Sequence, residues 1–195
     1  MVSKMARKLV CGTGINDADY KTQDVINGRK VACKFYQTWR NMIARCYDSK
    51  YQKNQPTYLG CTVSSDWLVF SRFKNWMETQ PWQGCELDKD LLHTGNKIYS
   101  PETCVFVDRV TNGFMVDCGA VRGDWPIGVY FNAKPRKFHS QCRNPFTKKR
   151  DYLGLFDCPN KAHQAWKKRK HELACQLADL QTDPRVAQAL RTRYL

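Results

Sequence analysis

The sequence predicts a mixed α+β protein in two parts, residues 1–120 and residues 121–195. Three observations favour this organisation. In the first part, apolar side chains recur at helical spacing in two segments and as short strand-like runs elsewhere. In the second part, three alternating runs precede one long amphipathic helix. A length of 195 residues is also enough for two small domains.

In the first part, residues 1–30 are polar and rich in turn-forming residues, which predicts an ordered loop or a short hairpin. Residues 35–47 place Phe35, Trp39 and Ile43 on one side of a helix. A second helix begins at Ser65 or Asp66 as its N-cap and runs to Met77. Its aromatic side chains have the spacing of core residues. The other predicted elements are strands at 85–92, 98–99 and 104–107 and a short helix at 108–114.

The second part contains three half-buried strands, because apolar and polar residues alternate in each. The predicted inward positions are Val129, Phe131, Phe138, Ser140, Cys142, Tyr152 and Leu155. Pro159 suits the first turn of the long helix, where an amide proton is not needed. The apolar stripe predicted to cover the sheet is Ala162, Ala165, Trp166, Leu173, Leu177 and Leu180.

Positive charge is concentrated in the second part. The chain has 32 Lys and Arg against 18 Asp and Glu, a net charge of +14. Residues 122–195 hold 16 cationic and 6 acidic residues, which gives 16 − 6 = +10. Such a balance favours binding to a polyanion, with a well-solvated basic surface as the alternative. A membrane surface is disfavoured, because the cations follow strand spacing as well as helical spacing and no lipidation motif is present.

Ten cysteines occur without a Cys-x-x-Cys pair. We expect most of them to be reduced, buried thiols. The spacing of Cys46, Cys61, Cys85 and Cys104 does not support a zinc site. The first residues lack the apolar core of a secretory signal, and no run approaches transmembrane length.

One face of the second predicted strand carries polar and cationic side chains. Lys137, His139, Gln141 and Arg143 alternate with the inward residues. The cations Lys134, Arg136, Lys148, Lys149 and Arg150 surround the two hairpin turns. A sheet can enter the major groove, where Arg and Gln bind the edges of guanine and adenine, while turn lysines contact phosphates. We therefore expect double-stranded DNA as the partner.

Three motifs in this part resemble a known DNA-binding domain. Gly128-Val-Tyr-Phe, Tyr152-Leu-Gly-Leu-Phe-Asp and Ala162-His-Gln-Ala-Trp look like the domain of plant Apetala-type, ethylene-response transcription factors. The same domain occurs at the C-terminus of many phage homing endonucleases. The resemblance covers residues 124–180, and it implies a three-stranded sheet packed on one helix, with the sheet reading the major groove.

Residues 35–114 resemble the companion region of those phage proteins. The similar motifs include Trp39-Arg-Asn-Met, Leu87-Asp-Lys-Asp and Tyr99-Ser-Pro-Glu-Thr-Cys-Val-Phe-Val. Their order looks like a divergent HNH nuclease module. The resemblance implies a ββα-metal fold with flanking helices, which holds a divalent metal against the scissile phosphate. Mg²⁺ or Mn²⁺ is the expected metal, with Zn²⁺ as the alternative.

Carried over by position, Asp88 is the metal ligand on the strand and Asn112 is the ligand on the helix. Asp90 shares a strand face with Asp88 and either binds the metal or neutralises Lys89. Without the resemblance, the same three residues fit a surface cluster of ion pairs.

The motif departs from the family at two positions. Lys89 stands where the general-base histidine belongs, and a lysine of ordinary pKa is a poor base at neutral pH. His93, four residues later, is the substitute base that the sequence offers. Thr103 stands where an asparagine often occurs in the family.

Three functions follow from these observations. The first is a metal-dependent DNA endonuclease that its C-terminal sheet directs to DNA. The second is a catalytically inactive, sequence-specific DNA-binding or regulatory protein on a decayed nuclease scaffold. The third is an inhibitor that binds an acidic host protein. The phage resemblance implies the cytoplasm of a bacterial host as the location.

Overall fold

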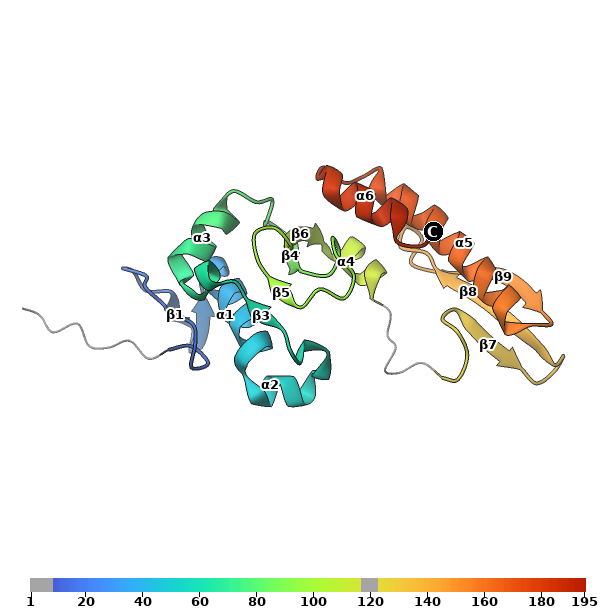
Figure 1. Ribbon diagram of the computed structural model, residues 1–195, viewed down its shortest axis with the longest axis horizontal. Coiled ribbons are helices and arrows are strands. Elements are labelled where there is room, and N and C mark those ends of the chain that lie inside the picture. Colours follow the sequence, from blue (N-terminus) through green and yellow to red (C-terminus); the bar gives the residue numbers. More distant parts are fainter. Residues whose placement is uncertain (1–8, 117–122) are drawn as a thin grey trace, which may run out of the picture. The chain divides into compact units, whose positions relative to one another are not determined.

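The computed structural model describes residues 9–116 and 123–195 and shows a mixed α+β fold (Figure 1). The chain forms two compact units, Met1–Val107 and Asp108–Leu195. The predicted α+β class is therefore confirmed. The ββα-metal arrangement expected in the first part stays a prediction. The boundary predicted between residues 120 and 121 lies outside the described residues.

The first unit combines short helices with two-stranded sheets. β1 (Gln23–Ile26) pairs antiparallel with β2 (Arg29–Ala32), which confirms the short hairpin expected near the start of the chain. β3 (Thr62–Val63) pairs parallel with β5 (Ile98–Tyr99), and β4 (Cys85–Asp88) pairs with β6 (Val105–Asp108). The helical elements are α1 (Lys34–Tyr47), α2 (Ser49–Asn54), the 3₁₀ helices η1 (Pro56–Tyr58) and η2 (Ser65–Leu68), and α3 (Phe70–Glu78).

Aromatic side chains from α1, η2 and α3 form the core of the first unit. Trp39 is fully buried, and its Nε1 donates a hydrogen bond of 2.7 Å to the carbonyl oxygen of Trp67. The Trp67 ring packs edge-on against Phe73, with 5.1 Å between ring centroids. Packing is therefore the role of these aromatic residues, as their spacing predicted.

The helix predicted up to Met77 is interrupted at Val69, which is extended and separates η2 from α3. The backbone there forms a β-bridge with Ile15: the Ile15 amide donates to Leu68, and the Phe70 amide donates to Ile15. A partner distant in sequence thus breaks the local helical pattern. In the polar stretch that follows α1, the Asp48 side chain caps α2, a helix that the sequence analysis did not predict.

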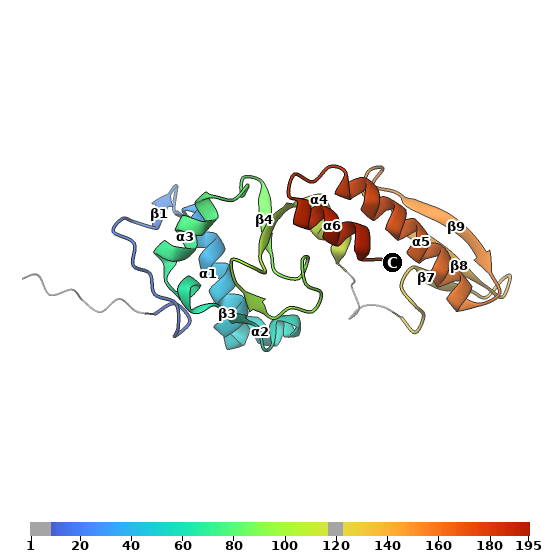
Figure 2. The same cartoon turned by 45° about the horizontal axis from the view of Figure 1, so that its top comes forward.

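The second unit contains the predicted sheet and long helix. β7 (Val129–Asn132), β8 (Lys137–Arg143) and β9 (Arg150–Phe156) form an antiparallel sheet in the order β7-β8-β9. α5 (Pro159–Ala178) lies along this sheet, and α6 (Pro184–Thr192) folds back beside α5 (Figures 1 and 2). Both parts of the prediction are confirmed.

α5 buries most of the predicted stripe, including Trp166, Leu173 and Leu177. The prediction was wrong for Leu180, which follows the end of the helix and is 68% exposed. A buried lysine, Lys170, takes a place in the stripe instead. Its stem packs among apolar groups while its Nζ donates to a backbone carbonyl, so a cation can occupy a buried position.

α4 (Arg109–Met115) belongs to the second unit. Nζ of Lys170 donates to the carbonyl oxygen of Phe114 at 2.7 Å, and Nε2 of Gln181 donates to Oγ1 of Thr111 at 3.2 Å. The Phe114 ring packs edge-on against Tyr194. These contacts explain why the two units divide after Val107, earlier than the boundary expected between residues 120 and 121.

Gly128 allows the start of β7 to approach Trp166 closely. A Cβ atom at Gly128 would lie 2.0 Å from Cδ1 of the indole, and the backbone φ of +81° is unfavourable for other residues. We expect Gly128→Ala to lower the free energy of unfolding by about 3 kcal/mol, through steric overlap and backbone strain. Urea denaturation followed by tryptophan fluorescence measures this change.

Gly123→Ala is the matched control, because nothing lies within 4 Å of the Cβ it would add. An equal loss of stability in both variants would show that the contact with Trp166 is not the cause.

Candidate nucleic-acid interface

The sheet of the second unit has one face covered by α5. Oγ of the buried Ser140 donates to the carbonyl oxygen of Ala162 at 2.7 Å. Asp151, the one carboxylate within the described strands β7–β9, forms an ion pair of 2.9 Å with Arg169 of α5. The helix-covered face therefore packs against α5, and the Asp151 carboxylate on it is neutralised by Arg169.

The other face is free of α5, and we call it the open face. Cross-strand pairing places Tyr130, His139 and Leu155 side by side on it, then Gln141 beside Tyr152. Residues directly opposite in an antiparallel sheet share a face. The complete open face is Tyr130, Asn132, Lys137, His139, Gln141, Arg143, Arg150, Tyr152 and Leu155.

Two open-face residues, Tyr152 and Leu155, were wrongly predicted to point inward. They are 63% and 39% exposed. The pairing of β8 with β9 shifts after Ser140, which leaves Leu153 as an extra residue in β9. Such a bulge turns the side chains that follow it, here that of Leu155, to the other face. Gly154, with a φ of +119°, is the local signal for this irregularity.

Aromatic rings surround the central residue of the open face. The His139 ring lies 5.0 Å from Tyr152 and 6.3 Å from Tyr130, centroid to centroid. Its Nε2 is buried and has no hydrogen-bond partner in the described part of the chain. The open face thus combines neighbouring, mutually tilted rings with polar groups, a mixture that suits contacts with base edges and sugars.

Arg143 and Arg150 face each other across β8 and β9, and both are exposed. Like charges directly opposite destabilise a sheet. Within the described residues, neither arginine forms an ion pair with a carboxylate. By contrast, Lys137 at the other end of β8 pairs with Asp157 at 3.3 Å. Uncompensated charge therefore lies at the end of the open face near the β8–β9 turn.

The predicted turn cations lie where the sequence analysis expected them. Lys134 and Arg136 are exposed between β7 and β8, and Lys148 and Lys149 are exposed between β8 and β9. The second turn is held by Asn144, whose Oδ1 accepts hydrogen bonds from two following backbone amides. Cations thus flank the open face at both hairpin turns.

The candidate catalytic residues begin at Asp88, the last residue of β4. Its Oδ1 accepts hydrogen bonds from the backbone amides of Asp90 at 2.8 Å and Leu91 at 2.6 Å. Burial raises the pKa of the Asp88 carboxyl, and the two amides oppose that rise. The carboxylate therefore ends the strand, which stops at Asp88 and not at Leu92 as predicted.

Lys89 is buried, with 5% of its surface exposed. Its Nζ donates to the carboxylate of Asp90 and to the carbonyl oxygen of Asn96, at 2.7 Å from the latter. The Asn96 side chain bridges back to the carbonyls of Lys89 and Ile98. The lysine and the asparagine together close the loop between β4 and β5, so the Lys89 ammonium is engaged within the fold.

The other candidate residues are His93 and Asn112. His93 is exposed, and no hydrogen bond or ion pair links its side chain to Asp88 in the described part of the structure. Asn112 is half-buried in α4, in the second unit, whereas Asp88 and Asp90 belong to the first. In the first unit, the structure therefore brings together Asp88, Lys89 and Asp90. No other predicted metal ligand of the first unit joins them in the described residues.

Within residues 9–116 and 123–195, no group of three or more His, Cys, Asp or Glu residues could hold a metal ion. The nine described cysteines are free thiols, as expected, but only four of them are buried, namely Cys46, Cys61, Cys104 and Cys142. Burial raises the pKa of Cys46 and of Cys104 to about 12, so both remain protonated at neutral pH.

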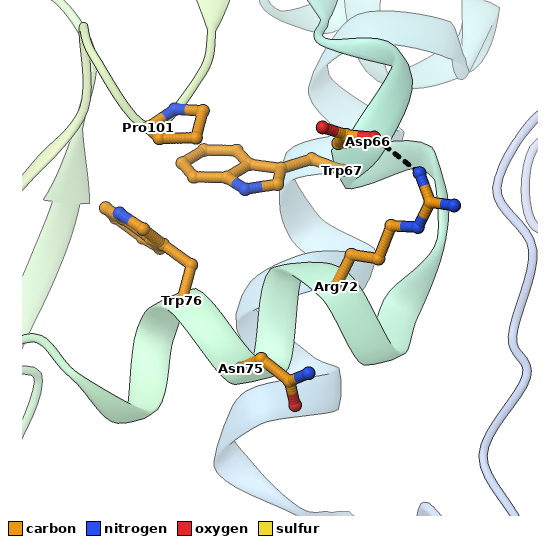
Figure 3. A pocket seen from close by; sticks show the side chains of 6 residues that line it. All are labelled: Asp66, Trp67, Arg72, Asn75, Trp76 and Pro101. Carbon is orange, nitrogen blue, oxygen red and sulfur yellow. Dashed lines mark hydrogen bonds and ion pairs between the residues drawn. The ribbon is translucent and has the colours of Figure 1, made fainter.

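An opening of about 440 Å³ lies beside α3. Figure 3 shows the indoles of Trp67 and Trp76 and the ring of Pro101 around it, with the Asp66–Arg72 ion pair at its rim. None of the candidate catalytic residues lines this opening. Its walls belong to the aromatic core of the first unit, and they bring no reactive groups together.

None of the helices in the described part of the chain combines the length and apolar character needed to cross a bilayer. Comparison with family models, with curated proteins and with solved structures gave no match to this chain.

Proposed function

We propose that this protein binds double-stranded DNA through the open face of β7–β9 and the two cationic turns beside it. The observation that carries the proposal is the direct opposition of Arg143 and Arg150. An anion placed between two like charges removes their repulsion, and DNA offers phosphates at regular spacing. The exposed cations of the two turns, Lys134, Arg136, Lys148 and Lys149, offer further contacts with phosphates.

The composition of the open face supports DNA over an acidic protein as the partner. Gln141 and Arg143 have the side chains that bind adenine and guanine edges with paired hydrogen bonds. Tyr130 and Tyr152 offer exposed rings next to His139, and all three lie on strands. Strands hold side chains at fixed spacing, which suits the reading of successive base pairs.

We expect Arg143→Ala to weaken DNA binding about tenfold, because one two-pronged contact is lost. The salt dependence of binding should also fall by about one unit of slope if Arg143 contacts phosphate. Fluorescence anisotropy of a labelled duplex, titrated at several salt concentrations, measures both quantities.

The matched control is Arg185→Ala, which removes the same charge from an exposed arginine of α6 that is ion-paired with Asp183. This variant should bind DNA like the wild type. Equal binding by the Arg143→Ala, Arg185→Ala and wild-type proteins would overturn the proposed role of the open face.

Metal-dependent hydrolysis of the bound DNA is the rival function. In its favour, β4 pairs with β6 and α4 follows next in the chain, which fits the strand–strand–helix order that the HNH resemblance implies. The loop after β4 does not fit a metal ion as it stands. Asp90 is bound by the Lys89 ammonium, and Oδ1 of Asp88 is bound by two amides. Binding without hydrolysis is therefore the function that the site supports best.

We expect supercoiled plasmid to remain intact when it is incubated with the protein and Mg²⁺ or Mn²⁺, under conditions where DNA binding is saturated. Agarose gel electrophoresis detects a single nick per plasmid. Metal-dependent nicking that is lost in Asp90→Asn, with DNA binding retained, would contradict this expectation and establish the nuclease.

A further inference from the structure

Arg45, near the end of α1, lies among tyrosines. The residue is half-buried, and its Nε is completely buried without a hydrogen-bond partner in the described residues. Its Nη1 is 3.5 Å from the hydroxyl oxygen of Tyr99, at the limit of a hydrogen bond. Its guanidinium carbon lies 5.4 Å from the centroid of the Tyr58 ring. The hydrogen-bonding neighbours of the Arg45 side chain are therefore tyrosine hydroxyls, those of Tyr99 and Tyr51.

No carboxylate compensates the charge of Arg45 within residues 9–116 and 123–195. The neighbouring tyrosines do not supply a negative charge either. Burial raises the pKa of both Tyr58 and Tyr99, so their hydroxyls are neutral at neutral pH. An uncompensated charge that is partly removed from water is unfavourable, and a bound anion relieves that cost.

A second cation lies near Tyr99. Nζ of Lys89 is 5.9 Å from the centroid of the Tyr99 ring, and Asp90 is its ion-pair partner. Asp90 compensates the charge of Lys89, so the charge that has no carboxylate partner in the described residues is that of Arg45. Tyr51, whose ring is 5.8 Å from Tyr58, is 38% exposed and places a further hydroxyl-bearing side chain next to the cluster.

We infer that Arg45 anchors a phosphate-binding site in the first unit, in which its Nη groups and the hydroxyls of Tyr51 and Tyr58 face the phosphate oxygens, while the buried Nε–H reports the binding. A guanidinium offers a planar pair of donors that matches two oxygens of a phosphate, and hydroxyl groups complete such sites. The phosphate belongs either to a nucleic-acid backbone or to a free phosphate. Assigning it to DNA rests on the proposed function, whereas the site itself does not.

The test uses the full-length, ¹⁵N-labelled protein. The Nε–H resonance of Arg45 is assigned in the wild type through its own backbone amide, so the assignment requires no variant. Inorganic phosphate is titrated against sodium chloride at equal ionic strength. We expect the Arg45 resonance to shift with phosphate to a saturating value and to stay in place with chloride. Arg72, which is exposed and ion-paired with Asp66, is the internal control and should not show the saturating shift.

A second arm titrates a short DNA duplex and compares the wild type with Arg45→Lys and Arg45→Gln. If DNA supplies the phosphate, the Arg45 resonance shifts and the salt slope of binding falls by about one in Arg45→Gln. Arg45→Lys keeps the charge but not the two-pronged geometry, so it retains the slope and loses affinity. Thermal unfolding confirms that each variant is folded.

A saturating shift with phosphate and an unchanged DNA slope would assign the site to a free phosphate. The absence of a saturating Arg45 shift with both phosphate and DNA would overturn the inference. Failure of the proposed DNA binding is recognised separately, because it appears as wild-type DNA affinity in Arg143→Ala and leaves the phosphate titration unaffected.

Discussion

The close approach of α5 to the sheet is the constraint on which the second unit depends. Gly128 has no side chain where the Trp166 indole packs, and Ser140 donates directly to the backbone of α5 at Ala162. The strand register places Phe138, Ser140 and Cys142 on the covered face. The residues of β8 that alternate with them therefore point to the opposite side. The open face is therefore a consequence of packing. Its cations lie together because successive side chains of a strand alternate between the two faces of the sheet.

Two buried lysines show that the formal charge of the chain overstates the charge available to a ligand. Nζ of Lys170 lies 3.4 Å from the centroid of the Phe114 ring and donates to the carbonyl of the same residue, which ties α4 to α5. Lys89 closes the loop after β4 through Asp90 and Asn96. Both stems pack like apolar side chains while the ammonium groups reach polar partners. These lysines stabilise the fold, and their contribution to the net charge of +14 is not a measure of DNA affinity.

Local patterns predicted much of the fold, and contacts between distant residues account for what they missed. Alternation and helical spacing located α1, α5 and the three strands of the second unit, because these patterns reflect one buried face each. The Val69 interruption depends on Ile15, and the outward turn of Leu155 depends on a bulge against β8. For the candidate site, residue type identified the open-face cations but not the burial of Lys89. That burial depends on a loop closed by Asn96, seven residues later.

The distribution of ion pairs separates structural cations from those available to ligands. Arg169 joins β9 to α5 through Asp151, and Arg191 pairs with Asp179. Such pairs are local and fix neighbouring elements, although exposed ones add little stability. Arg143 and Arg45 differ, because in the described structure each lacks a carboxylate partner, and each instead faces another arginine or a ring of neutral tyrosines. The proposals of DNA binding at Arg143 and of phosphate binding at Arg45 both start from this lack of a counter-charge in the described residues.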